Sequence, residues 1–347
     1  MSATSDKQSV RAAGWRRLGR MGALLSSLWL LGCSSGTRPE LDRESRERPE
    51  LAGDGPIEPL PLKIDFDDQR AALGEALFKE PLLSGDGKVA CSNCHSADHG
   101  LAEDKQRSFV PGRPESLVNS PTLYNIRYMY KLAWAGKFDS LEAHLDALIQ
   151  NPAVMASSWE SAARRLGEQP EYRDRFSRVF ADGLTPANVR AALIEYERSL
   201  VTPNAPFDRF LRGEINAISS DAKRGYALFK GYGCISCHQG AAVGANLVQR
   251  FGVMRDYFAD RGNVAPGDLG RYNVTRREED RFVFRVPSLR NVALTPPYFH
   301  DGSAKTLEDA IKVMGRYQLG RELAPDDVAL LSAFLRSLTG EYRGKPP

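Results

Sequence analysis

Two short segments of the sequence place a histidine directly after a pair of cysteines. Both have the form Cys-x-x-Cys-His, and they comprise Cys91, Cys94 and His95 in the first segment and Cys234, Cys237 and His238 in the second. This spacing is typical of c-type haem attachment, because the two thiols add to the vinyl groups of the porphyrin and the imidazole binds the iron. A structural zinc site or a redox dithiol is the alternative, but neither needs a histidine directly after each pair. We therefore expect two covalent haem c groups.

The fifth cysteine, Cys33, ends a segment that has the features of an export signal. Four arginines precede an apolar run over residues 21–31, which is too short to span a bilayer comfortably. The run closes on LLGC, which resembles a bacterial lipobox and predicts a lipoprotein signal over residues 1–33 with lipid on Cys33. An ordinary signal with an incidental cysteine is the alternative. We expect an exported protein at the periplasmic face, which meets the membrane surface through its lipid anchor alone.

Residues 34–60 are rich in Pro, Gly, Ser and charge and have almost no aliphatic periodicity, so we expect a flexible tether there. The whole chain of 347 residues is long enough for roughly two domains. Its 47 basic and 44 acidic residues nearly cancel, and no Lys/Arg run interleaved with aromatic residues appears in the body of the chain. This composition argues against nucleic acid as a partner.

The two halves of the chain resemble each other. LGEALFK at 73–79 and RGYALFK at 224–230 each run into a Cys-x-x-Cys-His segment. Farther along, the sequence from Pro121 matches the sequence from Pro287 without a gap. We therefore predict two cytochrome c-like domains in tandem, over residues 61–205 and 206–343, each with one haem.

Apolar periodicity predicts a mostly α-helical fold. Helices are expected over residues 69–79, 140–150, 187–200, 221–230, 306–314 and 326–338. Ser140 and Thr306 are candidate N-caps, and Pro325 lies just ahead of the last helix. Strand alternation is scarce, so we expect long loops around the haems.

The repeat indicates how the two haems differ. Met314, in the helix after Thr306, carries a thioether that suits the sixth position of the second haem iron, although a core methionine is the alternative. Leu148 occupies the matching position of the first half and cannot bind iron, so the first haem is expected to keep an open face. His144 lies one turn earlier on the same helix, where an imidazole can exchange a proton with peroxide. An exposed helix histidine is the alternative for His144.

These residues resemble the bacterial di-haem cytochrome c peroxidases and the related MauG-like enzymes. The resemblance runs from about residue 71 to residue 340 and includes NSPTLYN, TPNAPFDRFLRG, FRVPSLRNVALTPPYFHDG and IKVMGRYQLG. It implies that His238 and Met314 hold an electron-transfer haem and that His95 holds a haem that reacts with hydrogen peroxide. It also implies that Trp134 lies between the haems, with core packing as the alternative. A calcium ion at the Asn119 side chain and the carbonyls of Thr295 and Pro297 is implied in the same way.

Three positions depart from the pattern of the peroxidases in this family. Pro111 stands where the resemblance places a distal histidine, and proline cannot bind iron. Val154 stands at the position of the glutamate that assists peroxide cleavage, and His144 replaces a nearby glutamine. The acid–base role is therefore expected to have moved to His144, although His99, Glu103 and Asp104 in the preceding loop are other possible donors. Such an enzyme would need no reductive activation.

These departures favour a MauG-like function, in which peroxide drives the irons to high-valent states that oxidise a partner protein. The resemblance extends to di-haem enzymes of methanobactin systems, which oxidise tryptophan on a copper-binding partner. One alternative is a cytochrome c peroxidase that reduces hydrogen peroxide to water with electrons from a small cytochrome or cupredoxin. Another is a non-enzymatic di-haem electron carrier, which is favoured if both irons are six-coordinate.

Overall fold

The structure is a computed structural model that describes residues 55–345 and 347. The predicted signal, its Cys33 and residues 34–54 of the predicted tether lie outside the described residues. Within the described part of the chain, no helix combines the length and the apolar character needed to cross a membrane.

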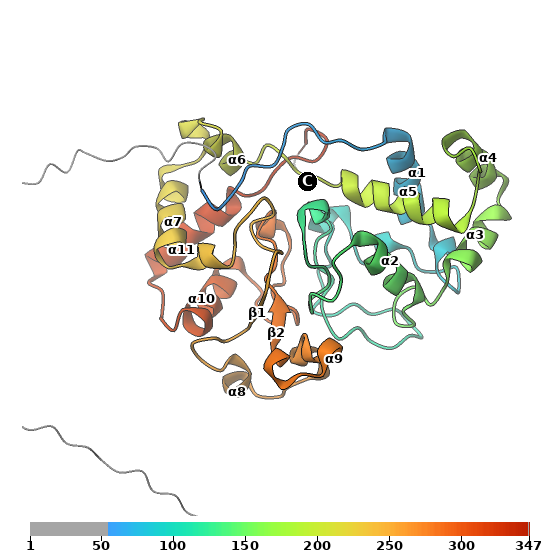
Figure 1. Ribbon diagram of the computed structural model, residues 1–347. Coiled ribbons are helices and arrows are strands. Elements are labelled where there is room, and N and C mark those ends of the chain that lie inside the picture. Colours follow the sequence, from blue (N-terminus) through green and yellow to red (C-terminus); the bar gives the residue numbers. More distant parts are fainter. Residues whose placement is uncertain (1–54, 346) are drawn as a thin grey trace, which may run out of the picture. The chain divides into compact units, whose positions relative to one another are not determined.

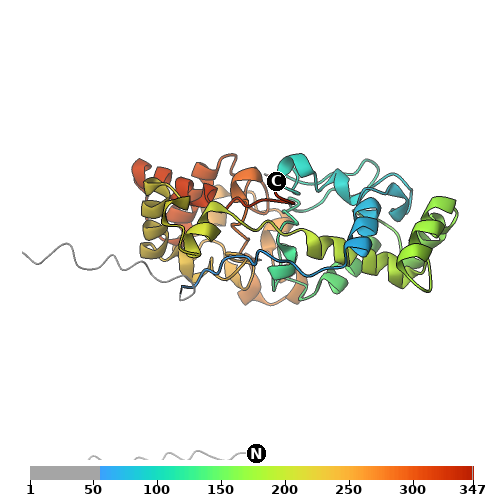
Figure 2. The same ribbon diagram turned by 90° about the horizontal axis from the view of Figure 1, so that it is seen from above.

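The fold is mostly helical, as predicted, and its helices form two groups (Figures 1 and 2). The first group comprises α1 (Asp68–Phe78), α2 (Leu141–Gln150), α3 (Trp159–Gly167), α4 (Pro170–Val179) and α5 (Pro186–Ser199). The second comprises α6 (Pro206–Leu211), α7 (Ser220–Gly231), α10 (Leu307–Gln318) and α11 (Pro325–Arg336). All six predicted helices are present. Ser140 and Thr306 cap α2 and α10 as expected, by accepting hydrogen bonds from the backbone N–H groups of Ala143 and Asp309.

The helix bounds differ from the predictions mainly at the C-terminal end of the chain. Helix α10 continues to Gln318, four residues past its predicted end, because Gly315 packs closely on Leu323 instead of ending the helix. Helix α11 includes Pro325 as its first residue, where proline's missing N–H costs no hydrogen bond. Helices α3 and α4 were not recognised in the sequence.

In each group, two helices cross at a glycine. Gly74 of α1 lies so close to α5 that an added Cβ would stand 2.0 Å from the carbonyl oxygen of Ala192. Gly225 of α7 lies equally close to α11, where an added Cβ would stand 1.9 Å from the carbonyl oxygen of Leu330. These glycines belong to the repeated segments LGEALFK and RGYALFK, so the repeat preserves a helix crossing that only glycine permits.

Each helix group surrounds its own apolar core. The first core includes Leu77, Phe78, Phe176 and Leu193, and the second includes Phe207, Phe229 and Phe334. Residues 248–285 lie in the segment between His238 and Pro287, which is longer than the equivalent segment between His95 and Pro121 in the first half. They form the strands β1 (Val248–Arg250) and β2 (Val283–Arg285), which pair antiparallel, and the short helices α8 (Tyr257–Arg261) and α9 (Tyr272–Thr275). A third, aromatic cluster around Phe251, Phe258 and Phe284 packs this segment against α10.

Equivalent residues of the repeat meet where the two halves join. The side-chain amides of Asn125 and Asn291, which are 166 positions apart, both donate to the hydroxyl of Thr202 at 2.9 Å. All three residues are fully buried. Each asparagine has a positive φ, a conformation that asparagine tolerates better than most residues. The junction is therefore a symmetric, fully satisfied polar contact between the halves.

The two ends of the described chain cross between the halves. Ile57 and Leu60 are buried, the carbonyl of Pro56 accepts a hydrogen bond from Gly240 N–H at 2.6 Å, and the carbonyl of Glu58 accepts one from Arg290 at 3.0 Å. The prediction of a flexible tether is therefore wrong for residues 56–60. The Pro- and Gly-rich composition concealed two apolar side chains that are buried, and Ile57 belongs to the second core.

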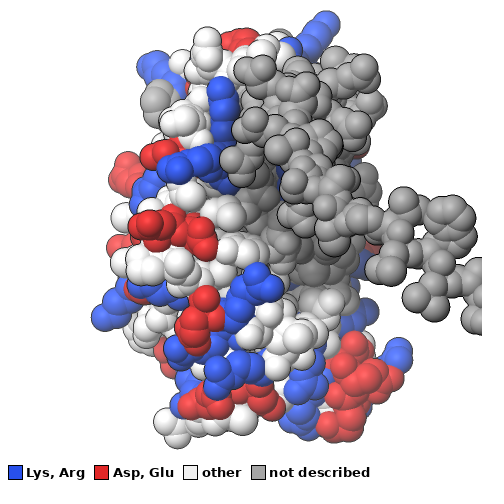
Figure 3. All heavy atoms as spheres, turned by 90° about the vertical axis from the view of Figure 1, so that its left-hand side faces the viewer, with Lys and Arg blue, Asp and Glu red and all other residues white. Residues whose placement is uncertain are grey.

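The C-terminal segment crosses in the opposite direction. The ring of Tyr342 packs on Tyr124 with a centroid distance of 5.5 Å, and Arg343 pairs with Glu75 of α1 at 2.9 Å. On the face shown in Figure 3, Lys and Arg lie among Asp and Glu among the residues that the structure describes. That face therefore presents a mixed surface instead of a field of one sign.

Candidate functional site

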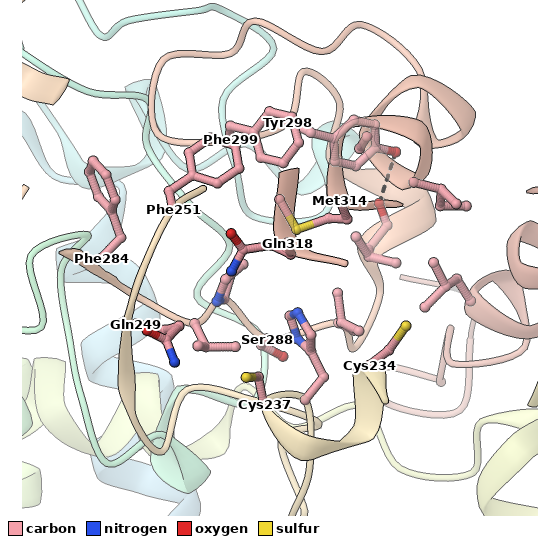
Figure 4. A pocket seen from close by; sticks show the side chains of 18 of the residues that line it. Cys234, Cys237, Gln249, Phe251, Phe284, Ser288, Tyr298, Phe299, Met314 and Gln318 are labelled. Atoms are coloured by element: carbon pink, nitrogen blue, oxygen red, sulfur yellow. Dashed lines mark hydrogen bonds between the residues drawn. The ribbon is translucent and has the colours of Figure 1, made fainter. Parts of the chain in front are cut away.

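A largely apolar cavity of about 400 Å³ lies beside the second Cys-x-x-Cys-His segment (Figure 4). Cys234, Cys237 and His238 line it on one side, and residues of α10, including Met314, line it on another. Cys234 begins a short 3-10 helix (Cys234–Ser236), and the N–H of His238 donates to the carbonyl of Cys234 at 3.0 Å. This turn brings both thiols and the imidazole to one wall.

His238 has the surroundings of a neutral metal ligand. Burial lowers the pKa of its imidazole to about 4, so the ring is uncharged at neutral pH. Its Nδ1 is buried near the carbonyls of Val243 and Pro287, although no aligned hydrogen bond forms there. Gly244 makes this approach possible, because an added Cβ would stand 2.4 Å from the Pro287 oxygen and 3.3 Å from Nδ1. With Nδ1 facing backbone carbonyls, Nε2 is the nitrogen available to iron.

The thioether of Met314 extends into this cavity from α10 (Figure 4). One turn later, the side chain of Gln318 donates to the carbonyl of Arg250 and accepts from the N–H of Val253, both at 3.1 Å. These bonds hold the loop after β1 against α10. The predicted ligands His238 and Met314 therefore line one cavity.

The first Cys-x-x-Cys-His segment has the same local geometry. Cys91 begins a 3-10 helix (Cys91–Asn93), and His95 N–H donates to the Cys91 carbonyl at 3.0 Å. The Nδ1 of His95 lies 3.0 Å from the carbonyl oxygen of Leu101, which fixes the ring and leaves Nε2 for a metal. Burial also lowers the pKa of His95, so this imidazole is neutral as well.

His144 is the titratable side chain on the inner face of α2. Its ring lies 5.4 Å from the Phe138 ring, and its Nδ1 is buried without a hydrogen-bond partner. Burial, with a smaller contribution from the nearby His95 and Arg285, lowers the pKa of His144 to about 4. Ala310, the residue at the matching position of α10, lines the second cavity. By the same register, His144 belongs to the face of α2 that turns toward the first site.

The departures from the family pattern lie close together. Leu148 is on α2, one turn after His144, and is partly buried. Pro111 is exposed in a loop that Arg113 ties to the carbonyl of Val154, and Arg113 also pairs with Asp86 at 2.6 Å. Neither Pro111 nor Val154 offers an ionisable group. His99, the other histidine considered for this site, is partly exposed and lies 3.7 Å from Asp104.

Trp134 and the residues expected to bind calcium also line the second cavity. The indole N–H of Trp134 donates to the carbonyl of Asn119 at 2.8 Å, and the Asn119 amide donates to the carbonyl of Lys105 at 2.6 Å. Thr295 and Pro297 line the same cavity. The structure therefore brings Trp134 and the three expected calcium ligands together.

Three buried polar residues near the sites were missed in the sequence. Arg285 and His300 line the second cavity, and the Nε2 of His300 lies 2.7 Å from the Asp268 carboxylate. Glu197 of α5 is 4% exposed, and one of its carboxyl oxygens has no hydrogen-bond partner. It lies near enough to Cys91 to contribute to the raised pKa of that thiol. Burial raises the pKa of Glu197 to about 8. Arg285 and His300 lie within the segment FRVPSLRNVALTPPYFHDG, which supported the family resemblance without assigning either residue a role, and Glu197 belongs to no motif.

These arrangements fit a covalent haem at each Cys-x-x-Cys-His segment. Each offers two free thiols and a neutral imidazole with one nitrogen directed toward backbone carbonyls, and the second opens on an apolar cavity. Within the described residues, the group of acidic and histidine side chains compact enough for a metal ion is Asp268, His300 and Asp301. Arg261 already pairs with both of these carboxylates, so a cationic side chain fills that cluster.

Comparisons with known proteins agree with this description. Residues 68–216 match the family described as di-haem cytochrome c peroxidase. The chain is 40% identical over 292 residues to cytochrome c551 peroxidase of Nitrosomonas europaea, which covers 84% of this chain and 86% of that protein. It is 38% identical over 288 residues to cytochrome c peroxidase Ccp of Escherichia coli, covering 83% of this chain but 62% of that longer protein.

A third relative and a solved structure extend the comparison. The chain is 35% identical over 272 residues to methylamine utilization protein MauG of Methylorubrum extorquens, covering 77% of this chain and 73% of that protein. The crystal structure of a MauG-like protein associated with microbial copper homeostasis shares the fold, with a TM-score of 0.72, 24% identity and coverage of 84% of this chain and 95% of that one. This chain therefore belongs to the di-haem cytochrome c peroxidase family of oxidoreductases.

Proposed function

We propose that this protein couples the reduction of hydrogen peroxide at its first haem to the oxidation of a partner protein through its second haem. The difference between α2 and α10 carries the proposal. Met314 lines the second cavity, whereas the matching residue of the first half is Leu148, which offers no ligand. His144 replaces a counterpart, Ala310, that has no ionisable group. One half therefore has a sixth ligand, and the other has an imidazole beside an open position.

The haem held by His95, when bound, supplies the iron that takes up peroxide and the electrons that break its O–O bond. His144 is neutral at pH 7, so it can accept the proton of the inner peroxide oxygen and return it to the outer one. Two electrons and two protons convert one peroxide molecule to two water molecules. Trp134 is proposed to mediate electron transfer between the halves, which its position in the lining of the second cavity supports.

We further propose that the halves are cytochrome c-like domains over residues 61–205 and 206–343, each with one covalent haem. The oxygens of Asn119, Thr295 and Pro297 would bind a calcium ion between them, since hard oxygen ligands suit this cation. Export to the periplasmic face with a lipid on Cys33 completes the proposal. It is supported by the sequence of residues 1–33 and by the family's relation to cytochrome peroxidases.

The electrons can come from two kinds of partner. One is a protein whose aromatic side chain is oxidised, as the MauG-like pattern at Pro111 favours. The other is a small cytochrome or cupredoxin, which the 38–40% identity to cytochrome peroxidases favours. A secreted copper-site protein is one candidate for such an oxidised partner protein. Peroxide turnover with a reduced small cytochrome, measured at equal enzyme concentration, would select the second kind.

Two measurements test the proposal. Intact mass after acid extraction should show two haems, and replacing Cys91 and Cys94 with Ala should remove one. Electron paramagnetic resonance of the ferric protein should show one high-spin and one low-spin haem, and Met314→Leu should change the low-spin signal alone. Two low-spin signals in the unaltered protein would favour the electron carrier, while bound zinc in place of haem would refute the proposal.

A further inference from the structure

Arg285, the last residue of β2, lies at the junction of the two halves. It is 4% exposed and lines the second cavity. Its backbone N–H donates to the carbonyl of Trp134 at 2.7 Å, its guanidinium lies 6.0 Å from the centre of the Trp134 ring, and one of its N–H groups reaches the sulfur of Met129 at 3.1 Å. The side chain thus belongs to the second half and contacts the first.

The guanidinium has no anionic partner within the described part of the chain. Its Nε is buried without a hydrogen bond, and the thioether of Met129 is a weak acceptor. Burial lowers the pKa of Arg285 to about 10, which still leaves the group charged at neutral pH. Burying an unpaired charge costs several kcal/mol, so a buried arginine is normally paired.

The walls of the cavity cannot supply that partner. No Asp or Glu is among the residues that line the cavity, whereas Arg250 and Arg285 both line it. Nearby arginines differ in this respect: Arg271 pairs with Asp280 at 3.8 Å and Arg261 with Asp301 at 2.6 Å. The missing negative charge must therefore arrive with the molecule that fills the cavity.

A haem carries two propionate carboxylates, and a planar guanidinium binds a carboxylate through two parallel N–H groups. We infer that Arg285 binds a propionate of the haem held by His238 and so positions that haem against the wall formed by Met129 and Trp134. This inference rests on the proposed haem at that site. A fixed positive charge at the propionate also favours the ferrous iron, so Arg285 is expected to raise the potential of this haem.

The experiment uses the full-length protein with both haems attached, which intact mass establishes first. Arg285→Gln removes the charge, Arg285→Lys keeps the charge without the two-pronged geometry, and Arg271→Gln is the matched control because Arg271 is already paired. Spectroelectrochemical titration measures the potential of each haem, and resonance Raman spectroscopy follows the propionate bending mode.

Arg285→Gln should lower the potential of the low-spin haem so that its ferrous-to-ferric ratio at a fixed potential falls at least tenfold, which is about 59 mV for one electron. Arg285→Lys should retain most of the potential but shift the propionate mode, and Arg271→Gln should change neither. If Arg285→Gln does not fold, an unshifted propionate mode in Arg285→Lys would overturn the inference. A shift confined to the high-spin haem would overturn the assignment to the second haem. A loss of haem from the mass would instead count against the proposed cofactor.

Discussion

Replacing His144 with leucine should separate peroxide chemistry from haem binding. The imidazole Nδ1 has no hydrogen-bond partner, so the change to Leu breaks no bond of the folded protein. Leucine also fits beside Phe138, which already contacts the ring at 5.4 Å. We therefore expect both haems to attach and their resting spectra to stay nearly unchanged, while the peroxide-dependent absorbance change slows by about two powers of ten or more, the usual worth of general acid–base catalysis.

The pH dependence provides a second readout. Because the pKa of His144 is about 4, its basic form predominates over the acidic form by roughly a thousandfold at pH 7. The rate constant of the unaltered protein should stay level from pH 8 to pH 5 and fall as the pH drops through about 4, where the imidazole gains its proton. His144→Leu should show no such fall, since it has no base to lose.

Stopped-flow mixing with hydrogen peroxide measures both effects. His99→Leu is the matched control, because His99 lies in the same half but is partly exposed beside Asp104 at 3.7 Å. Its rate should stay within about threefold of the unaltered protein, since it is not given a role in proton transfer. A His144→Leu protein that reacts as fast as the unaltered protein would refute the acid–base role, and a slow His99→Leu protein would transfer that role to His99.

Three further predictions concern ligation, packing and protonation. Leu148→Met should convert the high-spin signal to low-spin in paramagnetic resonance and block the reaction with peroxide, because it adds a thioether at the position that Met314 occupies in α10. A persistent high-spin signal would contradict the proposed equivalence of positions 148 and 314. Gly225→Ala should lower the free energy of unfolding by about 2–3 kcal/mol in denaturant titration, whereas Gly231→Ala, whose Cβ would meet nothing within 4 Å, should not; equal stabilities would refute the close crossing. The pKa of Glu197 rises from 4.5 to about 8 on burial, so the folded protein should lose up to about 5 kcal/mol of stability as the pH increases through this window. Glu197→Gln should abolish this loss, and matching curves of unfolding free energy against pH for both proteins would refute the prediction.

The sequence predicted the parts of the fold that local rules determine. Helices with strong apolar periodicity and a Ser or Thr cap, such as the one after Ser140, were found to within a few residues. The sequence singled out His95 and His238 as candidate haem ligands because haem attachment requires fixed spacing along the chain. The repeat then suggested Met314 and His144 as further candidates, since equivalent positions of a duplicated fold face equivalent surroundings.

The remaining features depend on contacts between distant segments. Arg285 ends the short strand β2 after two apolar residues, and this position alone does not distinguish it from a surface arginine. Its importance arises only when Met129 and Trp134 of the other half enclose it. Likewise, Ile57 becomes a core residue only because Arg290 and Gly240 bind the backbone beside it. Such partnerships have no signature within one stretch of sequence.

The duplicated backbone explains how one chain can carry two similar sites with different side chains. Asn119 N–H donates to the carbonyl of His300, and Arg285 N–H donates to the carbonyl of Trp134, each at 2.7 Å. Residues 119 and 285 are 166 positions apart, as are residues 134 and 300, so both bonds join equivalent backbone positions. These bonds use no side-chain atoms and therefore tolerate different side chains at each equivalent pair. An asparagine can stand where the other half has an arginine, and a tryptophan where it has a histidine, while the frame that holds both sites stays the same.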